Sequence, residues 1–193
     1  MSFRAGEDAE LVSAFLAGDR RAFDSLMRAH EDRVFAICLR ILNNRDTALD
    51  AVQETFITVY RKAQQFSGAS AFSTWLYRIA VNTCYDQLRR SKRHQAQPLP
   101  EVVEPADTRS QDLLGSVELR PDLEQALAGL APEFRVAVVL SDLEGLPLQA
   151  VAEALDVPIG TVKSRVFRGR RLLAEHLRNL SGSSVHQRDD HDA

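Results

Sequence analysis

The stretch AEALDVPIGTV, residues 152–162, decides the fold of the second half of the chain. Ala152, Asp156 and Val162 lie at relative positions 0, +4 and +10, which is the spacing of a helix-turn-helix. This motif needs a small residue where its helices cross, a turn residue that tolerates a left-handed backbone, and a branched core residue in the second helix. Asp adopts that left-handed conformation more readily than most side chains, although Gly does so at lower cost.

The second helix of this motif, expected over residues 159–175, has a basic outer face. Between Gly160 and Arg171 the sequence has five basic residues and no acidic one. Such a face can neutralise phosphates while central side chains reach base edges in a major groove. A solvated basic face is the alternative, but the aromatic Phe167 among these cations favours duplex DNA. The candidate DNA-binding residues are Thr161, Lys163, Ser164, Arg165, Phe167, Arg168 and Arg171.

Helical periodicity dominates the rest of the chain, and strand-like alternation is nearly absent. The first half shows four amphipathic segments, with a helix break expected at Asn43-Asn44 and a new N-cap at Asp46. A Pro-containing polar stretch then interrupts the pattern. We therefore expect an all-α protein of two helical domains, 8–94 and 118–178. A flexible linker over 95–117 joins them, and a disordered tail follows over 179–193.

Length and composition exclude several classes of protein. The chain has 193 residues, 45% of them hydrophobic and 26% charged, which is ordinary for a globular chain. No apolar run is long enough to span a membrane, and the acidic start does not resemble a secretory signal. Two cysteines, Cys38 and Cys84, form neither a disulfide framework nor a zinc site. We expect a cytoplasmic protein that needs no metal or other cofactor.

Charge is segregated along the chain, although its net value is only −3. Residues 61–95 have a net charge of +6 and residues 156–180 of +4, while residues 96–132 between them have −5. Separate basic segments indicate two contacts with a polyanion, whereas a chain that needs only solubility intersperses its charges. Two solvated helix faces remain the alternative.

The first domain carries a second candidate face, of a different kind. Arg78, Asn82, Tyr85 and Arg89 form one stripe of a helix that begins near residue 73, and Trp75 and Asp86 lie beside it. Aromatic rings among amide and guanidinium groups suit unstacked bases better than an intact duplex. The loop before this helix could enclose an extruded base with Phe66, Ser67, Gly68, Ser70 and Phe72. On composition alone, rings packed in the core explain this pattern equally well.

Three stretches, in this order, resemble the signature segments of the extracytoplasmic-function (group IV) sigma factors of the sigma-70 family. They are DAVQETF at 50–56, FSTWLYRIAVN at 72–82 and GTVKSR at 160–165. The resemblance covers about three quarters of the chain, roughly 8–93 and 117–178. This chain departs from the family in two places. Gln149-Ala150 replaces a pair that is often acidic in other members, and Asp86 lies at a position where members carry varied residues.

The resemblance implies a function for each segment. Asp50, Gln53, Glu54 and Phe56 match the segment that binds the clamp helices of the RNA polymerase core enzyme. The loop from Phe66 and the stripe through Trp75, Asn82 and Asp86 match the part that reads the melted −10 strand. The helix at 160–171 matches the reader of the −35 duplex of promoter DNA. An anti-sigma factor is a further implied partner.

Two other functions compete with this interpretation. A stand-alone helix-turn-helix repressor would need a dimerisation element, and it leaves the first domain unexplained. An enzyme has little support, because His30 lies on an apolar face and Glu54 has no partner acid or histidine placed with it. Cys38 and Cys84 are likewise expected to pack in the core rather than sense redox state. We expect no catalytic residue.

Overall fold

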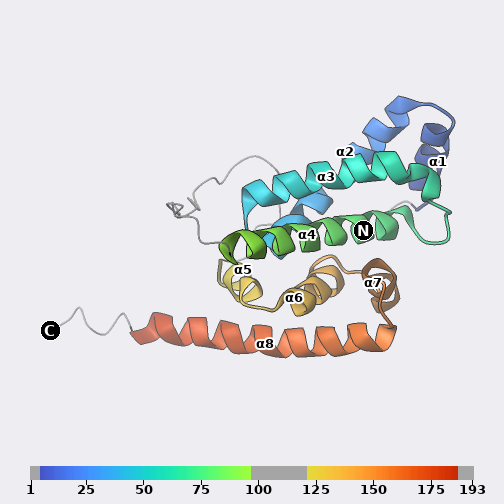
Figure 1. The fold of residues 1–193 in the computed structure, drawn as a ribbon. Helices are drawn as coiled ribbons and strands as arrows, with labels where there is room; N and C mark the ends of the chain where they lie inside the picture. Colours follow the sequence, from blue (N-terminus) through green and yellow to red (C-terminus); the bar gives the residue numbers. More distant parts are fainter. Residues whose placement is uncertain (1–4, 97–120, 187–193) are drawn as a thin grey trace.

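The structure is a computed structural model that describes residues 5–96 and 121–186, and every regular element in these two stretches is helical (Figure 1). This agrees with the expected all-α class. The expected linker lies almost wholly outside the described residues, as does the end of the expected tail. The first domain contains α1 (Ala5–Leu16), α2 (Arg20–Leu42), α3 (Arg45–Lys62), the short η1 (Ala63–Gln65) and α4 (Phe72–Ala96).

Side-chain and backbone caps define where α2 and α3 meet. Asn43 ends α2 in the left-handed region, with φ of 52°, and its N–H donates to the Leu39 carbonyl. The next residue, Asn44, accepts the N–H of Thr47 at 2.9 Å and so begins α3. The expected break at Asn43-Asn44 is confirmed, but the N-cap is Asn44 and not Asp46.

The core of the first domain comes from the apolar stripes of α2, α3 and α4. Ile37 and Ile41 of α2 and Leu76 of α4 are fully buried. Cys38 and Cys84 are also buried and meet between α2 and α4. Their hydrogen bond and their burial raise the pKa of the Cys84 thiol, so it stays protonated. Both cysteines therefore pack in the core, as the sequence predicts.

The second domain contains α5 (Pro121–Ala128), α6 (Pro132–Val138), η2 (Val139–Leu143), α7 (Leu148–Leu155) and α8 (Ile159–His186). Asp156 follows α7 in the left-handed region with φ of 55°, and Val162 is fully buried. The helix-turn-helix geometry that the spacing predicts is thereby confirmed. Helix α8 continues to His186, past residue 179, where the sequence analysis expects the tail to begin.

The helix α6 ends in a π-turn that the sequence does not predict. In η2 the N–H of Glu144 bonds to the carbonyl of Val139 at 2.9 Å, five residues back. A π-turn inserts one extra residue per turn and so shifts the direction of the side chains that follow it. Asp142 consequently faces α8, while Glu144 faces the first domain.

The two domains pack against each other rather than hanging apart on a tether. Helix α4 contacts α7, and α2 contacts α5, α6 and η2. Figure 1 shows α5, α6 and α7 between α4 and α8. One continuous core cluster joins Leu76 and Val81 of the first domain to Val151 and Val162 of the second. The sequence could not show this contact, because both partners read as ordinary amphipathic helices.

The crossing of α6 and α8 depends on Gly169. A Cβ placed on Gly169 would lie 2.6 Å from Cγ2 of Val138 and 3.2 Å from the carbonyl oxygen of Phe134. We expect Gly169→Ala to destabilise the chain by about 1–3 kcal/mol, because the two helices must move apart. Urea unfolding measures this change.

Gly160, in the same helix, is the matched control. A Cβ placed there meets no atom within 4 Å. Gly160→Ala should leave stability unchanged or raise it by up to about 1 kcal/mol. Equal losses for both variants would contradict the close crossing.

Candidate nucleic-acid interfaces

Helix α8 presents the predicted basic face to solvent. Lys163, Ser164, Arg168 and Arg171 are exposed, Thr161 and Arg165 are half-buried, and Val162 and Val166 point into the core. Phe167 is 71% exposed, which is unusual for a large apolar side chain. The structure therefore places all seven predicted residues on the accessible side of one helix or at its edge.

An ion pair orders the edge of this face. Arg170 donates to both carboxylate oxygens of Asp142, from Nε at 2.8 Å and from Nη2 at 2.7 Å. The Arg170 hydrogen bond holds the pKa of Asp142 below its usual range, although partial burial opposes this. Phe167 and Arg170 also line a groove of about 350 Å³ beside η2. Arg170 is thus already paired, whereas Lys163 and Arg168 extend from the exposed part of the face.

In the first domain, the predicted loop aromatics form one cluster. The rings of Phe66 and Phe72 are perpendicular with centroids 5.6 Å apart, and Trp75 lies 5.5 Å from Phe66. These are favourable aromatic geometries. Phe66 and Trp75 are half-buried and can offer a ring face to a base. Phe72 is only 5% exposed, and its ring packs beneath the other two.

The remaining loop residues surround this cluster at the surface. Ser67 and Gly68 are exposed, and Ser70 is half-buried. Gly68 has a φ of +72°, a conformation that glycine adopts without strain. The loop is therefore accessible, as a base-capturing loop requires.

The stripe along α4 is partly engaged by the second domain. Arg78 donates to Asp156 of the helix-turn-helix turn at 3.0 Å. Burial raises the pKa of Tyr85, and the nearby Arg165 opposes that shift, so the two side chains lie close together. Asn82 is exposed, and Asp86 pairs with Arg89 of its own helix. The stripe exists as predicted, but part of it faces α7 and α8 in this arrangement.

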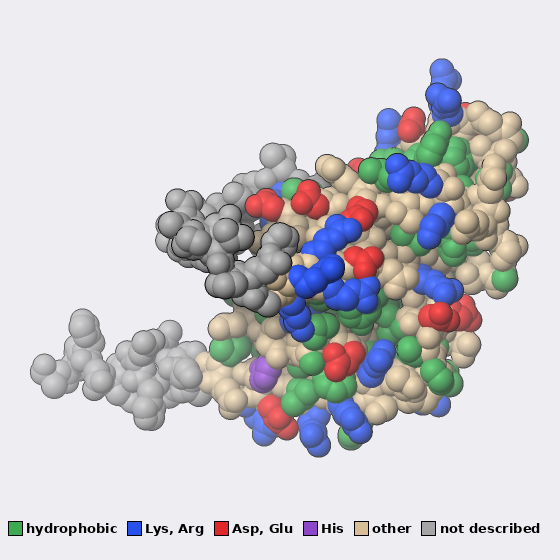
Figure 2. All heavy atoms as spheres, in the orientation of Figure 1, with side chains coloured by type: hydrophobic (Ala, Val, Ile, Leu, Met, Phe, Trp, Pro, Cys, Tyr) green, Lys and Arg blue, Asp and Glu red, His purple; other side chains and the backbone are tan. Residues whose placement is uncertain are grey.

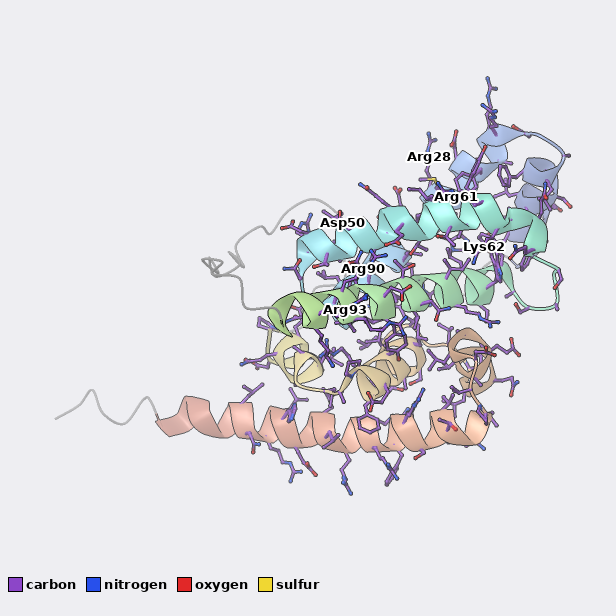
Figure 3. All side chains as sticks on the ribbon, viewed as in Figure 1. Arg28, Asp50, Arg61, Lys62, Arg90 and Arg93 are labelled. Atoms are coloured by element: carbon purple, nitrogen blue, oxygen red, sulfur yellow. The ribbon has the colours of Figure 1, made fainter. Side chains whose placement is uncertain are left out.

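Helix α4 ends in a basic patch, which we define as Arg89, Arg90, Lys92 and Arg93. All four are exposed. Figure 2 shows blue side chains gathered at this end of α4, and Figure 3 labels Arg90 and Arg93 there. The patch continues the aromatic and polar stripe, so a single strand could follow both.

The predicted polymerase-binding residues lie along α3, but they do not form one cluster. Asp50 and Gln53 are exposed, and Phe56 is 5% exposed (Figure 3). Glu54 turns toward α4 instead, where its carboxylate meets Arg90 at 3.5 Å and Gln87 at 3.3 Å. Glu54 therefore helps to join α3 to α4.

Sequence reasoning missed the apolar groove beside these residues. A groove of about 610 Å³ runs between α2 and α3, and Gln53 and Phe56 line it. Ile57 and Tyr60, which also line it, are 51% and 47% exposed. The available signal was an apolar surface on α3 wider than one core stripe, which is typical of helices that bind a partner.

Sequence reasoning also missed the polar contacts between the domains. The side chain of Glu144 is 6% exposed, and it accepts from Arg33 Nε at 2.7 Å and Arg40 Nη1 at 2.6 Å. The buried Arg135 donates to the Ile41 carbonyl at 2.6 Å. Arg33 also lies over the ring of Tyr77, whose burial raises its pKa to about 12. No local pattern marks these residues, because their partners are about 100 positions away.

The chain combines a helix-turn-helix that has a basic face with a second helical domain that has an aromatic and basic face. This combination is typical of a protein that binds nucleic acid at two sites. Comparison with known proteins agrees with this class. Residues 26–94 match sigma-70 region 2, and residues 120–173 match sigma-70 region 4.

Relatives match the chain through both domains. It is 40% identical to the ECF RNA polymerase sigma factor SigE of Mycolicibacterium smegmatis, over 87% of this chain and 67% of that protein. It is also 40% identical to SigM of Mycobacterium tuberculosis, over 90% and 86%. A solved structure of the sigma factor RpoE of Bartonella quintana with the anti-sigma factor NepR is similar, with a TM-score of 0.64 and 28% identity. That match covers 81% of this chain and 96% of RpoE.

The chain belongs to the extracytoplasmic-function (ECF) family of RNA polymerase sigma factors. It is therefore a transcription initiation factor that directs RNA polymerase to promoters. Among the described helices, none is long and apolar enough to cross a membrane.

The Asp142–Arg170 pair predicts a pH dependence of stability. Because the folded-state pKa of Asp142 is lowered, its stabilisation is present above the ordinary carboxyl pKa of about 4 and is lost as the pH falls. Melting temperatures measured from about pH 5 to pH 2 should fall less steeply for Asp142→Asn than for the unmodified chain. The exposed Glu133→Gln is the control and should keep the original slope.

Proposed function

We propose that the two domains read two parts of one promoter in different forms, the −35 element as duplex and the −10 element as a single strand. The observation that carries the −35 assignment is Phe167, an exposed apolar ring among exposed cations on one face of α8. Its ring suits a thymine methyl group in the major groove, and Lys163 and Arg168 suit phosphates or guanine edges. The proposed reader consists of Thr161, Lys163, Ser164, Arg165, Phe167, Arg168 and Arg171.

The proposed −10 reader lies on the first domain. Phe66 and Trp75 would stack with unpaired bases, while Asn82 supplies an amide and the basic patch binds the backbone. Ser67, Gly68 and Ser70 would line the strand, and Phe72 would support the rings from behind. Arg78 and Tyr85 become fully available only when the second domain moves away, and Asp86 and Arg89 would contact the strand beside them. We assign this region to residues 8–94, which adds α1 to the matched segment.

The groove between α2 and α3 is the proposed docking site for the polymerase clamp helices. Its apolar wall and the exposed Gln53 at its edge suit an amphipathic helical partner, and the exposed Asp50 one turn earlier on α3 would add a contact outside the groove. Phe56 would form its floor, and Glu54 would act indirectly by fixing α4 through Arg90. This surface lies away from the α8 face, so both can be occupied together.

The chain itself is proposed to be a cytoplasmic initiation factor and not an enzyme, because its family acts by recruiting the catalytic polymerase. An anti-sigma factor is the proposed regulator. The support is the similar sigma factor of Bartonella quintana, which was solved with the anti-sigma factor NepR.

The packed arrangement of the domains has to open before a promoter can be read. The −10 and −35 elements are 25 base pairs apart by their numbering, or roughly 85 Å at about 3.4 Å per base pair. In the structure, however, Arg78 of the −10 stripe is 3.0 Å from Asp156 of the helix-turn-helix. The two readers cannot reach both elements from this position. The packed arrangement is therefore a state that precedes promoter binding.

Substitutions in the two readers should have separable effects. Arg168→Ala should weaken promoter binding by about 1–3 kcal/mol and relax −35 selectivity, because it removes a contact to the duplex. Trp75→Ala should spare polymerase binding and impair open-complex formation, because it removes a stacking ring. Promoter binding by the holoenzyme and permanganate footprinting of the melted strand measure these outcomes. Loss of polymerase binding in both variants would refute the assignment.

Glu144→Gln should shift the chain toward the open arrangement. It removes the charge held by Arg33 and Arg40, and hydrogen bonds between charged groups of this kind contribute roughly 2 kcal/mol. The radius of gyration from small-angle scattering should increase, and fluorescence transfer between labels on the two domains should fall.

Asp156→Gly is the matched control. It removes only the exposed pair with Arg78, which is worth about 1 kcal/mol or less, and glycine suits the left-handed turn. A larger opening in this control than in Glu144→Gln would contradict the assigned role of Glu144.

A further inference from the structure

A buried hydrogen-bonded pair joins α1 to α2 beneath the proposed −10 reader. His30 is fully buried, and its Nε2 lies 3.0 Å and 3.1 Å from the two carboxylate oxygens of Asp8. A carboxylate only accepts hydrogen bonds, so Nε2 carries the hydrogen that it donates. This bond fixes both the tautomer and the plane of the imidazole ring.

The fixed imidazole packs against the aromatic cluster. Its ring centroid is 5.5 Å from that of Phe72, at an interplanar angle of 60°. Phe72 in turn contacts Phe66 at 5.6 Å and Trp75 at 5.9 Å. The chain of contacts therefore runs from Asp8 through the fully buried His30 to Phe72, and then to the two half-buried rings that can meet a base.

Core filling alone does not explain a polar pair at this position. Removing a carboxylate and an imidazole from water is costly, and apolar residues of similar shape often give equal or greater stability. A polar pair adds direction, because a hydrogen bond holds a ring in one orientation and an apolar contact does not. Binding sites are commonly fixed in this way by residues behind those that touch the ligand.

We propose that Asp8 and His30 are positioning residues for the −10 strand. They hold Phe72 in place, and Phe72 holds Phe66 and Trp75 with their ring faces presented to an unstacked base. This inference rests on the proposed −10 function of those rings. It also gives α1 a part in promoter reading, although α1 lies outside the segment that matches sigma-70 region 2.

Trp75 is the only tryptophan of the chain, so its fluorescence reports directly on this cluster. In the free full-length chain, Asp8→Ala should shift the emission of Trp75 to longer wavelength and increase its quenching by acrylamide. Asp8→Asn keeps an oxygen that can accept from His30 and should retain most of the original emission. Ile41→Val, a buried substitution at the far end of α2, is the control for lowered stability and should leave the emission unchanged.

A second measurement tests positioning against a purely structural role. The full chain, bound to core polymerase, is titrated with single-stranded DNA taken from a promoter that this holoenzyme selects from a random library. Each −10 base is replaced in turn by an abasic site, and the position with the largest loss identifies the captured base. We expect Asp8→Ala to bind the intact strand about tenfold more weakly than the unmodified chain does. Its affinity should fall little further when the captured base is replaced by the abasic site. Non-additivity of this kind shows coupling between Asp8 and the base.

The possible outcomes separate this inference from the proposed function. The first outcome concerns the loss of affinity that the abasic site causes. If Trp75→Ala no longer shows this loss, while Asp8→Ala and His30→Gln show it in full and keep the original Trp75 emission, the positioning role is wrong. If Trp75→Ala also shows the full loss of affinity at the abasic site, the −10 function of the rings is wrong, and the inference is overturned with it. If Asp8→Ala does not fold, Asp8→Asn is compared with His30→Gln. Weaker binding of the intact strand by His30→Gln alone supports the positioning role.

Discussion

The arrangement of the whole molecule depends on one buried carboxylate, that of Glu144. Two arginines of the first domain hold it, and its side chain has almost no access to water. A buried charge of this kind is stable only while its partners stay in place. Around it, Arg135 bonds to the end of α2, and apolar residues of both domains merge into one core cluster. The relative position of the two readers follows from this contact.

The same contact explains why the first domain shows only part of its nucleic-acid face. Arg78 and Tyr85 lie toward the second domain, whereas Asn82 and the basic patch remain open to solvent. The groove on α2 and α3, which is the proposed docking site for polymerase, is open as well. Under the proposed assignments, recruitment to polymerase would come before promoter recognition by both domains.

Sequence patterns predicted most of the fold because most of it depends on local signals. The spacing of Ala152, Asp156 and Val162 predicts the helix-turn-helix, and the structure has the left-handed turn at Asp156 and the buried Val162. Asn43 and Asn44 predict a helix boundary in the same way. The outer face of α8 was predicted residue by residue, because a helix of known phase determines which side chains face out.

The features that the sequence did not predict depend on distant partners. Glu144 and Arg33 are each unremarkable surface residues by composition, and only their contact across the chain gives them a function. Phe72 fits the aromatic pattern of its loop, but only the structure shows that it is buried against His30. Likewise, only the structure shows that Glu54 pairs with Arg90 of α4. Local patterns define helix faces, and tertiary packing decides which residues on a face stay available.

The π-turn of η2 has a mechanical consequence. Asp142 and Glu144 are two residues apart on this short segment, yet one is tied to the DNA-facing helix and the other to the opposite domain. A force that draws Arg170 toward a phosphate acts on the same few peptide units that carry Glu144. The segment thus links two sets of ion pairs, one to α8 and one to the first domain, so a shift of its backbone alters both.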